Sequence, residues 1–190
     1  MTRSRSSDHK HPPSGPLVLD TRELGRRPGA MREVRREVPA PADLGVDLIK
    51  VPEGAPLLLD LRLESVSEGV LVSGYVDATA EGECGRCLDP VSQPLHVHLQ
   101  ELFAYPGSST EETTDEDEIA RLDDERADLE PVIRNAIVLD LPLTPLCDPD
   151  CAGLCAGCGE RLDDLPDDHT HEQIDPRWAA LQEKFGKPDQ

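Results

Sequence analysis

The chain has 190 residues, of which 37% are apolar and only 3% aromatic, and this length suits one domain, or one domain with a small satellite and tails. Acidic residues outnumber basic ones 39 to 19, and the formal net charge of −20 argues against extended nucleic-acid contact through the body of the protein. No apolar run reaches the roughly 18 residues of a transmembrane helix, and no apolar stretch follows the basic N-terminus as in a secretory signal. We therefore expect a cytoplasmic protein without a membrane partner.

The N-terminal part of the chain carries its positive charge. Residues 1–16 are rich in Ser, His and Pro and predict a disordered tail. Glutamates interrupt the basic run that follows, so one interpretation is a solvated lead-in whose charge pairs with the acidic body. The other interpretation is contact with an RNA backbone, for which the candidate residues are Arg22, Arg26, Arg27, Arg35, Arg36 and Arg86.

Residues 17–105 predict a β-rich core. The leucines at 57, 59, 61 and 63 alternate with mostly polar residues, which is typical of a strand with one buried face. A further strand runs from Val70 towards Cys84, and another follows Pro90. His96 and His98 alternate on this last strand and are expected at its surface. Short turns between sequential strands favour an antiparallel meander or a small open barrel.

The segments after the sheet region differ sharply in composition. Residues 106–128 are strongly acidic and predict a linker, which could also attract a basic partner. Residues 129–146 predict the core helix, because apolar residues recur there at helical spacing and a proline follows Glu130 in its first turn. Residues 176–190 predict a short C-terminal helix and tail. The fold class predicted is α+β, with one helix packed on an antiparallel sheet and a C-terminal zinc knuckle over 147–175.

The cysteines indicate metal binding. All six lie in two groups, Cys84 with Cys87 and then Cys147, Cys151, Cys155 and Cys158. Thiols stay reduced in the cytoplasm, so disulfides are disfavoured there. Two Cys-x2-Cys pairs with glycine at each turn strongly favour a metal site. Tetrahedral Zn²⁺ suits such ligands best, and an iron–sulfur cluster is the minor alternative.

The number of candidate ligands matches two zinc ions. With His169 and His171, the cysteines make eight ligands, enough for two tetrahedral sites. The favoured partition places Cys84 and Cys87 with Cys147 and Cys151, and Cys155 and Cys158 with the two histidines. The alternative is a single site of four thiolates drawn from the two Cys-x2-Cys pairs. Closed coordination spheres leave no open position for a substrate, and no nucleotide-binding or hydrolase motif is present, so we do not expect an enzyme.

Two cysteine segments resemble those of one known family. The run from Glu83 to Pro90, the run from Cys147 to Gly159 and the sequence Asp-Pro-Arg at 175–177 are similar to signatures of the YceD family, the large ribosomal RNA subunit accumulation proteins. His169-Thr170-His171 stands where family members often have Cys-x-Cys, which keeps the ligand spacing of the second site.

The resemblance implies a role in the accumulation or processing of 23S ribosomal RNA and in maturation of the large ribosomal subunit. The expected partner is therefore the precursor of that subunit, through its RNA or a basic ribosomal protein, and no small-molecule substrate is expected. A non-enzymatic assembly factor is the favoured function. The alternatives are a zinc-ribbon accessory protein that binds ribosomal RNA through the basic N-terminal segment, and a zinc-dependent regulator.

Overall fold

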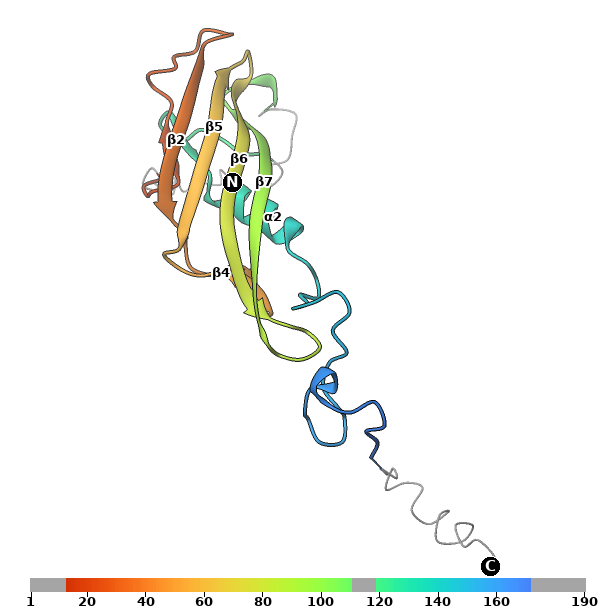
Figure 1. The fold of residues 1–190 in the computed structure, drawn as a ribbon. Helices are drawn as coiled ribbons and strands as arrows, with labels where there is room; N and C mark the ends of the chain where they lie inside the picture. The colour runs from red at the N-terminus through yellow and green to blue at the C-terminus, as the bar shows by residue number, and fades with distance from the viewer. Residues whose placement is uncertain (1–12, 111–118, 172–190) are drawn as a thin grey trace, which may run out of the picture.

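A computed structural model describes residues 13–110 and 119–171 of the chain. Its main element is a six-stranded antiparallel sheet with the strand order β2-β5-β6-β4-β3, in which β7 pairs with the other edge of β6 (Figure 1). The strands of this sheet are β2 (Met31–Pro39), β3 (Leu44–Val46), β4 (Ile49–Val51), β5 (Pro56–Ser65), β6 (Gly69–Glu83) and β7 (Pro90–Ala104). The antiparallel sheet of the sequence prediction is confirmed, and the sheet does not close into a barrel.

One helix and a second small sheet cover one face of the main sheet. Helix α2 (Glu130–Asp140) lies behind the sheet in Figure 1. Strand β1 (Val18–Asp20) pairs antiparallel with β8 (Arg126–Asp128), and residues beside them join the same core. No described helix is long and apolar enough to span a membrane.

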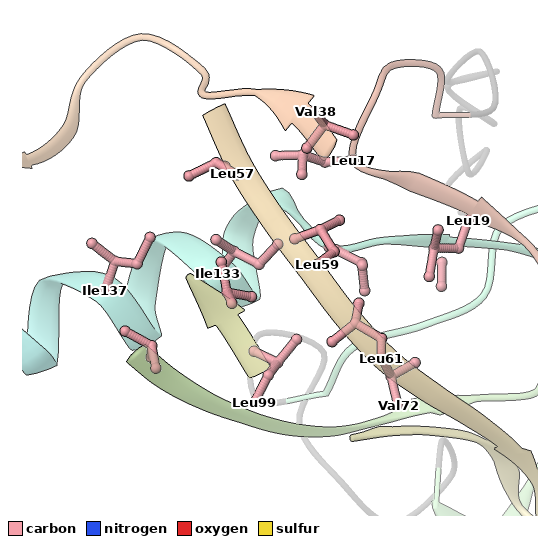
Figure 2. Close-up of a cluster of buried hydrophobic side chains, with 14 of the residues drawn as sticks. Leu17, Leu19, Val38, Leu57, Leu59, Leu61, Val72, Leu99, Ile133 and Ile137 are labelled. Carbon is pink, nitrogen blue, oxygen red and sulfur yellow. The ribbon is translucent and has the colours of Figure 1, made fainter. Parts of the chain in front are cut away.

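The core forms where the alternating leucines of β5 meet the helix. Leu57, Leu59 and Leu61 are at most 2% exposed, and Figure 2 shows them on the side of the sheet that faces Ile133 and Ile137 of α2. Period-two alternation on the strand and spacing of four on the helix place these side chains on two opposed apolar faces. The predicted packing of one helix on the sheet is therefore present.

The helix is shorter than the segment 129–146 predicted for it. A proline occupies its first turn, where the missing N–H costs no hydrogen bond. The helix ends at Asp140, because Leu141 adopts an extended backbone and Pro142 follows. Residues after 141 run as an irregular segment towards the cysteines.

Strand β2 lies in the basic run interrupted by glutamates, where the sequence shows no alternating pattern that would identify a particular strand. It pairs with β5 over its whole length, from Met31 opposite Glu64 to Pro39 opposite Pro56. Only Val34 and Val38 are buried, and the remaining residues are mostly charged and exposed. Charged residues on an edge strand discourage the addition of a further strand, which explains why β2 is rich in charge. The same charged residues leave no clear apolar alternation from which the strand could be predicted.

Part of the acidic segment 106–128 is folded rather than a linker. Leu122 is 4% and Ala127 0% exposed, and strand β8 pairs with β1. The backbone of Leu122 also hydrogen-bonds to Ala104 at the end of β7. Residues 111–118 of the predicted linker, the predicted C-terminal helix and residues 1–12 of the predicted tail lie outside the described residues.

Candidate metal centres

The turn between β6 and β7 places Cys84 and Cys87 side by side. The two strands pair from Gly69 opposite Ala104 to Glu83 opposite Pro90, so this long hairpin carries the turn at its end. The backbone N–H of Leu88 donates to the carbonyl of Cys84 at 2.9 Å, and the N–H of Arg86 points to the Cys84 Sγ at 3.5 Å. This tight turn aims both sulfur atoms at one point.

The segment after α2 brings two more cysteines to the same point. The N–H of Gly85 donates to the carbonyl of Pro145 at 2.8 Å, which ties the hairpin turn to this segment. The Cys84 Sγ lies 3.9 Å from that of Cys151, and the Cys87 Sγ lies 3.4 Å from that of Cys147. Tetrahedral zinc with bonds of about 2.3 Å to sulfur separates its sulfur ligands by about 3.8 Å. The four thiols, named here the first centre, therefore fit a zinc ion.

The electrostatics of the first centre also favour a cation. Burial opposes ionisation of Cys84, but hydrogen bonds from the backbone N–H groups of Cys147, Cys87 and Arg86 outweigh it and lower its pKa to about 6. The N–H of Asp89 acts to lower the pKa of Cys87, yet burial and the neighbouring thiols raise it to about 12. One thiolate therefore forms readily and opposes the next, and a divalent cation removes this repulsion.

The second centre forms within a single stretch of chain. It consists of Cys155, Cys158, His169 and His171, whose ligand atoms all lie within 4.8 Å of one another. The Cys158 Sγ lies 3.5 Å from the Nε2 of His169. Hydrogen bonds from the backbone N–H groups of Cys158 and Gly157 lower the pKa of Cys155 to about 6. Two thiols and two imidazoles are a common donor set for tetrahedral zinc.

The two cysteine turns repeat one geometry. In the second turn the N–H of Gly159 donates to the carbonyl of Cys155 at 2.8 Å, and the N–H of Gly157 points to the Cys155 Sγ at 3.4 Å. These contacts correspond to those of Leu88 and Arg86 in the first turn. The last residue of each turn has a positive φ, 66° at Leu88 and 76° at Gly159. The grouping of the eight ligands is the partition favoured from the sequence, and metal binding itself stays a prediction.

An arginine joins the two centres. Arg161 forms an ion pair with Asp89, which follows the first turn, and its backbone bridges to Leu154 beside the second turn. Asp89, Cys87 and Cys147 raise the pKa of Arg161 through their negative charge, Asp89 most of all. A zinc ion with four thiolates carries a net charge of about −2, which a neighbouring guanidinium stabilises. Sequence reasoning missed Arg161 and Asp89 as site residues, because only the fold brings them together.

The arginines proposed for RNA contact are mostly engaged with the protein itself. Arg22 pairs with Asp124 at 2.8 Å, Arg35 with Asp60 at 3.1 Å, and Arg26 with Glu125 at 2.6 Å. These contacts are the ones expected if the basic segment neutralises the acidic body. These ion pairs remain largely exposed to solvent, so each contributes little to stability.

The other three candidates for RNA contact all have exposed side chains. Arg86, in the first turn, donates from Nη1 to the carbonyl of Cys151 at 2.7 Å. This bond supports the first centre and leaves the rest of the exposed Arg86 side chain at the surface. Arg27 and Arg36 are exposed. Direct contact of any of these residues with RNA stays a prediction.

Known proteins similar to this chain match between 69% and 98% of its length. An uncharacterized protein of Mycobacterium tuberculosis is 53% identical over 186 residues, which cover 98% of this chain and 89% of the relative. An uncharacterized protein of Mycobacterium leprae is 46% identical over 181 residues, covering 95% and 83%. The uncharacterized protein YlbN of Bacillus subtilis is 25% identical over 132 residues, covering 69% and 73%. No solved structure matches significantly.

The family model that matches has the description "Large ribosomal RNA subunit accumulation protein YceD" and covers residues 72–183. The matched region begins within β6 and includes the β6–β7 hairpin, helix α2 and both cysteine turns. The matched residues make up more than half of the chain, and they hold all eight candidate ligands. Because the family model covers this much of the chain, including both cysteine turns, the chain belongs to the YceD family.

Proposed function

We propose that this chain is a non-enzymatic factor in biogenesis of the large ribosomal subunit in the cytoplasm, where it supports accumulation or processing of 23S rRNA. The family name implies a role in large ribosomal subunit RNA accumulation. The observation that supports a binding role is the arrangement of the eight ligands into two groups of four. Four protein ligands fill the coordination sphere of zinc, which is typical of structural rather than catalytic sites.

In this proposal each centre binds one zinc ion. The metal stabilises the segment after the helix, where hydrophobic packing is sparse. The described part of the segment after the helix, residues 142–171, contains one short 3-10 helix, Leu162–Asp164, and few buried apolar side chains. Such a segment cannot offset its ordering entropy by hydrophobic burial alone. Zinc binding supplies that free energy, as it does in small zinc domains. The zinc-bound end of the molecule would then present a rigid surface to the subunit precursor.

The proposed function is tested in a strain that lacks the gene. We expect less mature 23S rRNA and fewer large subunits, with small subunits nearly unchanged, as measured by sucrose-gradient sedimentation and RNA blotting. The wild-type chain should restore the profile. Cys84→Ala should not restore it, because without zinc at the first centre the β6–β7 hairpin is no longer held against the segment after α2. A normal profile in the deletion strain would remove the ribosomal role.

A second complementation experiment distinguishes direct contact of the basic segment with RNA from docking through a protein partner. Reversal of charge at Arg27 and Arg36, which are exposed, removes two of the candidate phosphate contacts while it leaves the ion pairs of Arg22, Arg26 and Arg35 intact. Full rescue by this variant favours docking through a protein partner. Failure to rescue, together with a steep salt dependence of RNA binding by the purified wild-type chain, favours the direct-contact alternative.

A further inference from the structure

The face of the main sheet opposite helix α2 has a cluster of rings at its centre. The side chains of Tyr75, His96 and His98 all point to this face, since Tyr75 lies opposite His98 and Asp77 lies opposite His96 in the β6–β7 register. No described element crosses this face, whereas α2 covers the other (Figure 1). Tyr75 is 43% exposed, and Leu58, opposite Asp77 on β5, is 48% exposed. Outward positions of an antiparallel sheet are usually polar, so a contiguous apolar and aromatic patch there is unusual.

The rings hold one another in a defined arrangement. The rings of Tyr75 and His96 stack with centroids 4.4 Å apart and an angle of 10° between their planes. His98 meets Tyr75 edge-on at 5.2 Å. The carboxylate of Asp77 hydrogen-bonds to the Nδ1 of His96 at 2.6 Å and orients that ring. This ring cluster is therefore organised before any partner arrives, which lowers the entropic cost of binding.

The charge on the same face indicates the chemistry of the partner. Carboxylates outnumber cations at the outward positions. Two of the cations already have acidic partners, Arg35 with Asp60 at 3.1 Å and Arg62 with Glu64 at 3.1 Å. The outward acidic residues, from the strand register, are Glu33, Glu37, Asp60, Glu64, Asp77, Glu81 and Glu83, against Arg35, Lys50 and Arg62. A phosphate backbone would be repelled by this face, and a basic polypeptide would be attracted to it.

A hollow beside the rings has the size and lining to accept one side chain. It has a volume of about 320 Å³, and its lining includes Glu33, Asp60, Tyr75 and His98. Arg62 also lines it, but the guanidinium of this residue is paired with Glu64 at 3.1 Å. Arginine is the side chain that uses both parts of this lining, because its planar guanidinium stacks on aromatic rings and donates paired hydrogen bonds to carboxylates. A lysine ammonium matches only the charge.

We infer that the exposed sheet face around Tyr75, His96 and His98 is a docking surface for an arginine-rich segment of a basic protein partner. One guanidinium stacks on the Tyr75 ring at the hollow, and the surrounding carboxylates accept its N–H groups and attract neighbouring arginines. This surface is separate from both metal centres. The inference rests on the proposed function only in that the subunit precursor would supply the basic partner.

The test is a titration of the full chain, loaded with zinc, against a fluorescent peptide of alternating Arg and Ser, read by fluorescence anisotropy. We expect binding that Tyr75→Ala weakens about fivefold and that Tyr75→Phe leaves unchanged, because the ring face is kept. The corresponding Lys–Ser peptide should bind the wild-type chain more weakly than the Arg–Ser peptide. Thermal unfolding of each variant verifies the fold, and His96→Ala serves as a second disruption of the ring stack.

A matched pair of charge variants locates the binding face. Glu33→Gln changes a carboxylate that lines the hollow on the proposed surface, whereas Asp140→Asn removes the same charge at the end of α2 on the other side of the sheet. We expect the first to weaken peptide binding and the second to have no effect. Equal effects of the two variants, or no binding of the Arg–Ser peptide, would overturn the inference. If a uridine oligonucleotide binds the wild-type chain and Tyr75→Ala abolishes that binding, the partner of this surface is RNA. This result would also overturn the inference.

The outcome is independent of the ribosomal test. The peptide titration needs no ribosome, so a normal subunit profile in the deletion strain would leave a positive binding result intact. Conversely, an abnormal profile that Tyr75→Ala rescues fully would keep the proposed function and remove this surface from it.

Discussion

The first and second cysteine turns share one backbone geometry but lie in different surroundings. In the first centre Cys84, Cys87 and Cys151 are buried, and only Cys147 is exposed, whereas in the second centre Cys158 and His171 are exposed and the other two ligands are half-buried. The first centre joins segments about sixty residues apart, and the second joins residues of one short segment. The role of such a turn therefore depends on where its other two candidate ligands lie in the chain. Ligands from a distant segment would connect two parts of the fold, whereas ligands from the same segment would stabilise only that segment.

This difference predicts unequal losses of stability. We expect Cys84→Ser to lower the free energy of unfolding by several kcal/mol, and Cys155→Ser to lower it by much less. A ligand pair distant in sequence closes a larger loop in the unfolded chain, and zinc bound there stabilises the folded state of the entire domain. Urea unfolding followed by circular dichroism measures both changes. Equal losses would show that the two centres support the fold alike.

The two centres should release zinc at different rates. With a chelator in excess we expect two kinetic phases, a fast one from the exposed second centre and a slow one, at least about tenfold slower, from the buried first centre. A zinc-sensitive dye follows the release, after elemental analysis has established two zinc ions per chain. Cys155→Ser should abolish the fast phase only. Loss of the slow phase in that variant would reverse the assignment.

A methyl group at the second turn should disturb only the second centre. A Cβ at Gly157 would lie 2.3 Å from the ring of His171, which must then move away. We therefore expect Gly157→Ala to weaken zinc binding at the second centre about tenfold, which is typical when a group that orients a metal ligand is changed. Competition with a zinc indicator measures the affinity. Ala156→Gly, one residue earlier, is the control and should change it little; a similar effect of both variants would point to the turn backbone instead.

The smallest effect concerns the last residue of each turn. Leu88 has a φ of 66° and an exposed side chain, a backbone conformation that favours glycine, and Gly159 occupies the matching position of the second turn. We expect Leu88→Gly to raise the free energy of unfolding by about 0.5–1 kcal/mol and Gly159→Ala to lower it by a similar amount. Thermal melts of the zinc-loaded variants test the opposite signs. A loss with Leu88→Gly would mean that the Leu88 side chain makes contacts that outweigh its strain.

The local part of the metal centres could be predicted from the sequence. Cys-x2-Cys with a glycine at the turn encodes its own geometry, because hydrogen bonds within five residues orient both sulfur atoms. The alternating leucines of β5 and the apolar spacing of α2 are equally local. Strand β2 could not be predicted, because its charged residues form a strand only when β5 supplies the partner hydrogen bonds.

The sequence by itself determined the antiparallel sheet, the single packed helix and the eight candidate ligands, since each follows from a pattern repeated within a few residues. Only the tertiary structure decided that the carboxylate of Asp89 meets Arg161, that the acidic residues 124 and 125 neutralise Arg22 and Arg26, and that Tyr75 and His96 stack on an open face. These contacts join residues from different strands or loops. Their distances depend on strand register and on how the chain returns to the sheet, which no local pattern encodes.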